Sequence, residues 1–413
     1  MFSLINIEWI KMKRSLFFKI LLFLLTIGIV GYYIYIFSNT IGADEVSEVI
    51  ESSLMSEKEQ LAHLELLEQE EGDSFDQSSR HALKQYREWV PAHQAQIDGI
   101  ASSDWTKWAN GNIITKNFSE TNLPEYWEHK YQSRFTLETH KSMLEWMRDR
   151  NIQPLWPNNF WLTQYDVYFD EGIEPIVRND FGKRHSSSGS YFNYHLFEKL
   201  FTMIGIFFFI FLFSDIVTKE GEGRNGPINL LRTLPVHRLA VLPSKFGAVL
   251  LMTIGTLAGI FLFATLLATV FDRFGDWDYP TLIYGENYTY EWVPLGLFLI
   301  KSVWLFLLVL IFSYSLLFFF SFLTNHAIIA LGITLTLLVL GVNWAEQSVL
   351  SGNTHFFPFH YLNVFPIISN EFAVLHDNFA FSYQNGVLSL VVSSIVLLFF
   401  TYLLSVYRYR TRG

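Results

Sequence analysis

The sequence predicts an all-α polytopic membrane protein: six transmembrane helices, with a mainly α-helical extracellular domain inserted between helices 1 and 2. The chain has 413 residues, of which 51% are hydrophobic and 16% are charged, whereas about 25% of residues are charged in soluble proteins. Several uncharged runs reach the roughly 20 residues that a helix needs to cross a bilayer. A long acidic stretch, residues 40–195, separates the first of these runs from the rest.

Residues 1–39 are expected to form an N-terminal interfacial helix and the first span. Ile5, Trp9 and Met12 fall at helical spacing among basic residues, as in a helix that lies on a membrane surface. The apolar run 16–37 follows. It is too long for the apolar region of a signal peptide and lacks a small-residue cleavage site, so we expect a retained span.

Residues 40–195 are expected to form an extracellular soluble domain. They hold 14 Lys and Arg against 26 Asp and Glu, while the whole chain has a formal net charge of −10. The remainder is therefore slightly basic, and basic loops stay in the cytoplasm. Apolar residues recur at helical spacing between 46 and 67, and residues 79–98 and 136–150 are further helix candidates. Residues 160–170 form either a short strand or an aromatic loop. A region of this length can bury its own core.

Residues 196–413 hold the other five spans, expected at 196–217, 246–271, 294–322, 328–349 and 387–406. Residues 272–293 are acidic and are expected to face outward. Residues 350–386 contain no Lys or Arg and are too apolar for a simple loop. Three arginines close the chain, which indicates that both termini are cytoplasmic.

The polar segment 218–245 lies between two spans and carries five basic residues against two glutamates. Its glycines and Pro227 interrupt the preceding helix. The following residues fit a short amphipathic helix at the cytoplasmic surface, interrupted at Pro235. We interpret this segment as the contact between the membrane domain and a partner, made by residues Leu231, Arg232, Thr233, Leu234, Pro235, Val236 and Arg238.

The region in which a span is followed by a glycine-bearing turn and then by LLRTLPVHRLAVLPSK resembles the permease subunits of bacterial ABC-2 type exporters. The opening LINIEWIKMKRSLFFKILL is similar to the start of that family. The resemblance covers the membrane part and not residues 40–195. It implies a coupling helix in 218–245 that docks on an ABC ATPase subunit. It also implies two ATPase copies, a second permease subunit, identical or different, short re-entrant extracellular helices in 350–386, and a location in the bacterial plasma membrane.

No motif predicts chemistry within the chain itself. No P-loop sequence is present, so the ATPase must be a separate polypeptide. The Gly-x-Gly-x-x-Gly at 221–226 follows a span and precedes a proline, so it is not a dinucleotide site. The histidine pairs lack zinc-helix spacing. We therefore expect a transporter subunit that is not an enzyme, with no cofactor, metal or nucleic acid.

The leading hypothesis is an exporter permease driven by a separate ATPase. Its substrate class stays open among lipids, antimicrobial peptides, hydrophobic drugs and ions. The alternative is a membrane sensor or scaffold whose extracellular domain binds a peptide or cell-wall ligand. A third hypothesis is a polytopic membrane enzyme without a recognisable catalytic set. Phenylalanine runs at 207–213 and 316–322 either line a path for an amphiphile or face lipid, and we favour lipid.

Overall fold

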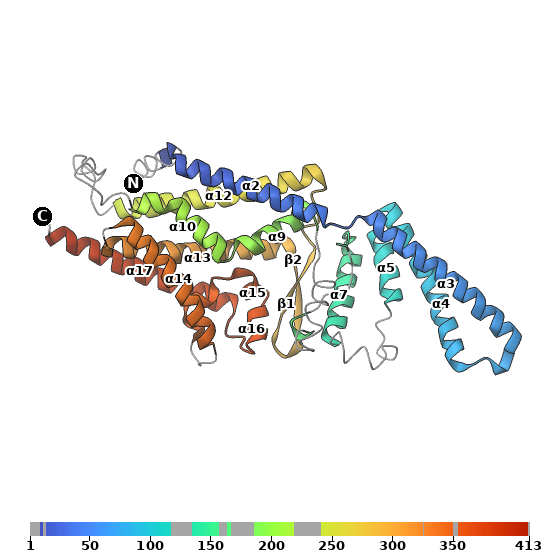
Figure 1. Cartoon of the computed structure of the whole chain (residues 1–413). Helices are drawn as coiled ribbons and strands as arrows, with labels where there is room; N and C mark the ends of the chain where they lie inside the picture. Colours follow the sequence, from blue (N-terminus) through green and yellow to red (C-terminus); the bar gives the residue numbers. More distant parts are fainter. Residues whose placement is uncertain are drawn as a thin grey trace.

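The computed structural model describes residues 9–10, 14–116, 134–156, 163–166, 186–218, 241–324, 326–349 and 354–411. Long apolar helices form one bundle, and helices α3, α4 and α5 extend from one end of it (Figure 1). The start of α2 and the end of α17 lie at the opposite end of the bundle (Figure 1). The predicted soluble helices, α3, α4, α5 and α7, and the apolar bundle are thus arranged along one axis.

Five described helices are long and apolar enough to cross a membrane, or up to six if one bent pair counts as a span. The five unbroken candidates start or end within a few residues of the predicted spans, because length and lack of charge decide both. Their helices are α2 (Leu16–Ser38), α12 (Val241–Phe271), α13 (Leu295–Thr324), α14 (Ala327–Ser348) and α17 (Tyr383–Thr411).

The predicted continuous second span is wrong. The chain instead forms α9 (Gly189–Leu200) and α10 (Met203–Thr218), which meet at an angle of 77°. A Cβ atom on Gly205 would collide with the Leu200 carbonyl, so glycine permits the close approach at the bend. The Phe201 carbonyl accepts a hydrogen bond from Val364 N at 3.2 Å. A later segment of the chain therefore satisfies one of the backbone groups that the bend exposes.

Helix α13 is the centre of the bundle and packs most extensively against α17 and α14. More than half of its most apolar window is buried, against a third or less for the other unbroken candidate spans. The phenylalanine runs contribute to this core: Phe209, Phe213 and Phe318 are buried. Our prediction that these runs face lipid is wrong for these three side chains, although Phe211 is exposed. Lipid and protein core are both apolar, so hydropathy alone cannot separate them.

The described part of 40–195 is mainly helical, as predicted, with α3 (Ala43–Glu71), α4 (Gln77–Ser102), α5 (Trp105–Thr115) and α7 (Arg134–Arg150). Most of 160–170 lies outside the described residues, and 164–166 form a 3₁₀ turn. Helices α3 and α4 are paired antiparallel neighbours, bridged where His93 contacts Glu57 at 2.6 Å. A Cβ on Gly111 would collide with the Ala92 carbonyl, so α4 and α5 are in close contact.

The acidic loop before α13 contains a β-hairpin that the all-α prediction missed. Strands β1 (Pro280–Tyr284) and β2 (Tyr290–Pro294) pair antiparallel, with Leu282 opposite Trp292. Leu282 and Tyr284 pack with Phe135 of α7 in a small cluster. Trp146 of α7 donates its indole N–H to the Asp278 carbonyl at 3.0 Å. The hairpin thus joins the soluble helices to the bundle.

Residues 354–382 form short helices, as the family resemblance implied. They are η5 (Thr354–Phe356), η6 (Pro358–Tyr361), α15 (Val364–Ile368) and α16 (Glu371–Leu375). Tyr361 and Ile367 are fully buried against the bundle. Burial on this scale makes the segment part of the packed membrane domain and not a loose connection.

The bend predicts the effect of substituting Gly205. Gly205→Val should destabilise the protein by about 1–3 kcal/mol, because the added carbon atoms displace the Leu200 carbonyl. Gly28→Val is the matched control: it places the same residue in α2, where nothing lies within 4 Å of a Cβ. Thermal unfolding in lipid nanodiscs measures both. Equal melting temperatures would contradict the packing at the bend.

Candidate functional site

The predicted coupling residues Leu231, Arg232, Thr233, Leu234, Pro235, Val236 and Arg238 lie outside the described residues. The structure describes the helices on either side, since α10 ends at Thr218 and α12 begins at Val241. These two helix ends lie at the same end of the bundle as the start of α2 and the end of α17 (Figure 1). The segment is therefore attached at the end of the bundle opposite the soluble helices.

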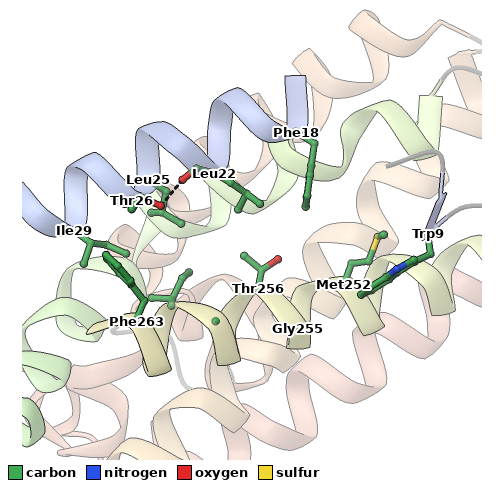
Figure 2. Close-up of a pocket in the computed structure, with 12 residues that line it drawn as sticks. Trp9, Phe18, Leu22, Leu25, Thr26, Ile29, Met252, Gly255, Thr256 and Phe263 are labelled. Atoms are coloured by element: carbon green, nitrogen blue, oxygen red, sulfur yellow. Dashed lines mark hydrogen bonds between the residues drawn. The ribbon is translucent and has the colours of Figure 1, made fainter. Parts of the chain in front are cut away.

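A groove of about 340 Å³ lies between α2 and α12 (Figure 2). Phe18, Leu22 and Ile29 point into it from α2, and Met252 and Phe263 point into it from α12 (Figure 2). Trp9 closes the end nearest the N-terminus (Figure 2). Both helices are candidate spans, so the groove lies at the depth of the apolar bundle.

The floor of the groove is open because Gly255 and Gly259 present no side chain. A Cβ on either glycine would have no atom within 4 Å. The hydroxyl of Thr26 is satisfied within its own helix, where it donates to the Leu22 carbonyl at 2.9 Å. Apart from the hydroxyl of Thr256, the lining is thus apolar, and it fits an alkyl chain or an apolar side chain better than a charged group.

Sequence reasoning did not find this groove. Gly255 and Gly259 are four residues apart, a spacing that lets apolar helices approach closely. Here the two glycines leave a space between neighbouring helices and not a close contact. The spacing was a usable signal, but it did not identify α2 as the facing helix.

Ionisable residues in and beside the spans are few and near the helix ends, as expected from the cost of burying charge. Glu198 and Lys199 pair with each other at 3.3 Å at the end of α9. Glu346 is exposed near the end of α14, and so is Asn343, which is polar but uncharged. Within the described residues, no group of three or more His, Cys, Asp or Glu can hold a metal ion.

A family model described as ABC-2 family transporter protein matches residues 2–413. The chain therefore belongs to the ABC-2 transporter family, and the resemblance inferred from the membrane part is confirmed. The match also includes residues 40–195, for which the sequence resemblance made no claim. No curated protein and no solved structure matches the chain. Family membership makes it a transmembrane permease subunit whose partner is an ABC ATPase subunit.

The open groove predicts that a large side chain fits at Gly259. Gly259→Leu should leave stability unchanged or raise it, because leucine has the higher helix propensity and meets no atom. Gly205→Leu provides the contrast, since the same side chain collides there. Melting temperatures in nanodiscs measure the difference. A loss larger than about 0.5 kcal/mol at Gly259 would mean that the groove is filled.

Proposed function

We propose that this protein is the permease subunit of an ATP-driven exporter that moves an amphiphilic, peptide-like or lipid-like substrate outward. The observation that carries the proposal is the family match over residues 2–413. The sequence has no P-loop, which agrees with a separate ATPase subunit. Two ATPase copies and a second permease subunit, identical or different, complete the proposed assembly.

The apolar groove between α2 and α12 supports an amphiphilic substrate. It offers space for an apolar chain beside two candidate spans. Substrates that partition into a bilayer reach such a groove from the hydrocarbon, without crossing a polar surface. A strongly charged substrate would need polar partners that the described lining does not supply.

We place the protein in the bacterial plasma membrane, with both termini and segment 218–245 in the cytoplasm and residues 40–195 outside. Basic residues gather at the termini and in 218–245, while 40–195 is acidic. In this orientation the coupling residues face the compartment that holds ATP. The soluble helices then face the side on which the substrate is released.

The second candidate function is a sensor or scaffold whose extracellular region binds a peptide or cell-wall ligand. The observation that favours it is the projection of α3 and α4 away from the bundle (Figure 1). Val49, Met55 and Leu66 of α3 are exposed there, and they are large apolar side chains. Such residues are common at sites that bind other proteins. Purification without any ATPase would favour this function over export.

Charge reversal tests the coupling segment. Arg232→Glu and Arg238→Glu should reduce retention of the ATPase and substrate-stimulated ATP hydrolysis. Breaking a buried charge pair costs roughly 2–5 kcal/mol, whereas releasing one basic residue from an anionic membrane costs about 1 kcal/mol. Lys11→Glu, in the predicted N-terminal interfacial helix, controls for lipid attraction alone. Normal assembly and stimulation in both arginine variants would exclude docking through these arginines.

Topology is testable because the natural chain contains no cysteine. Ser79→Cys, partly exposed in the first turn of α4, should react with a membrane-impermeant thiol reagent added to intact cells. His326→Cys, exposed between α13 and α14, should react only after the cells are opened. Labelling of position 326 but not position 79 in intact cells would reverse the proposed orientation.

A further inference from the structure

A second cavity of about 450 Å³, called the outer cavity below, lies where the short helices meet the ends of α10 and α14. Met203 stands at the start of α10, and Glu346 stands near the end of α14. Phe359, His360 and Leu362 come from the segment around η6, and α16 contributes Glu371, Phe372 and Leu375. The cavity is therefore next to the 77° bend, at the end of the bundle that carries the soluble helices.

His360 is the unusual wall residue. Its side chain is only 5% exposed, yet neither ring nitrogen has a hydrogen-bond partner within the described part of the chain. Its neighbours are the rings of Phe381, 4.8 Å away, and Phe372, 6.1 Å away. A neutral imidazole carries one donor and one acceptor, and leaving both unpaired in an apolar site is unfavourable. A hydrogen-bond donor on a ligand in the cavity would satisfy the acceptor nitrogen of this ring.

The charges around the cavity have one sign. Among the described residues that line it, Glu346 and Glu371 are the acidic ones, and none is Lys or Arg. The nearby Lys199 is paired with Glu198. Burial lowers the pKa of His360 to about 4, so its imidazole is neutral at neutral pH and adds no positive charge. Apart from the polar side chains of Gln164, Asn363 and His376, the rest of the wall is aromatic and aliphatic. It suits an apolar body and lets a cation lie over an aromatic face.

We propose that this outer cavity binds a hydrophobic amine, with the ammonium group at Glu371, a hydrogen bond to His360 and the apolar body against Phe359 and Phe372. Each part of the ligand matches a feature of the wall. The ammonium group pairs with the Glu371 carboxylate and donates a hydrogen bond to the His360 imidazole, and the apolar body packs against the aromatic rings. A metal ion does not fit, because the described residues hold no group of three metal-ligating side chains. The proposal concerns binding by this chain alone and does not depend on the ATPase.

The electrostatics of the site make binding depend on pH. Burial, together with the neighbouring Glu198 carboxylate, raises the pKa of Glu371 to about 7. Below that pH the carboxyl group is protonated and loses its attraction for an ammonium group. A primary amine stays protonated throughout, so affinity should fall as pH drops from 8 to 6. Other ionisable groups around Glu371 are Tyr194, Glu198 and Lys199 of α9, Glu346 of α14, and His360 and His376.

The test uses the full chain in lipid nanodiscs and two fluorescent probes. Dansylcadaverine is a hydrophobic primary amine, and its N-acetylated form has the same body without the charge. Energy transfer from tryptophan to the dansyl group reports binding, after subtraction of the signal from empty nanodiscs. At pH 8 the amine should bind at least about tenfold more tightly than the acetylated probe. Because Glu371 is largely protonated at pH 6, this preference should fall about tenfold there.

The variants separate the site from nonspecific uptake. Glu371→Gln should weaken amine binding about tenfold at pH 8 and abolish the pH dependence. His360→Phe should weaken binding while keeping or raising the melting temperature, because an unpaired polar group is replaced by a ring. Glu291→Gln removes an exposed carboxylate of β2, away from the cavity wall, and should bind as the natural protein does.

Equal affinity for the two probes would overturn the proposal, since the cavity would then accept neutral amphiphiles such as lipid. Unchanged binding in both Glu371→Gln and His360→Phe would overturn it as well. If His360→Phe fails to fold, the isosteric Glu371→Gln variant and the pH profile of the natural protein still decide the question.

Discussion

The bend between α9 and α10 is the constraint on which the membrane part depends. Inside hydrocarbon a backbone polar group needs a partner from the chain itself, and a broken helix leaves some of these groups unpaired. Gly205 lets the Leu200 carbonyl approach closely, and Val364 donates to the Phe201 carbonyl. The ring of Phe201 stacks on Phe306 of α13 at 4.3 Å between centroids. The bent pair, the central helix and the short helices therefore require one another.

The soluble helices are joined to this unit by a continuous core. Trp108 of α5 and Met147 of α7 belong to the same buried cluster as the residues of α13. The β-hairpin and the residues just before it add polar contacts on both sides: the Asp278 carbonyl accepts from Trp146, and the Tyr284 carbonyl accepts from Asn370 at 2.7 Å. Residues 40–195 can thus bury apolar surface against the bundle as well as among themselves. A force on the soluble helices reaches the short helices through packed contacts.

How much of the fold was predictable follows from what hydropathy measures. Five spans were located well, because a bilayer sets their length and excludes charge. The same measure cannot tell lipid from protein core, so it failed for Phe209 and Phe318, which are buried. It also missed the break at 201–202, which depends on Gly205 and on a partner that comes from Val364. The hairpin at 280–294 was missed because the acidic charge of that loop predicts its side of the membrane but not its local structure.

The outer cavity could not be found from spacing, because Met203, Glu346, His360 and Glu371 come from separate segments that only the packed bundle brings together. The structure also relates this cavity to the predicted coupling segment. Met203, on the cavity wall, and Thr218, next to that segment, are the two ends of the 16-residue α10, which is about 24 Å long. A tilt imposed at Thr218 by an ATPase would move Met203 and the cavity wall, whereas an unbroken second span would pass the cavity without ending at it.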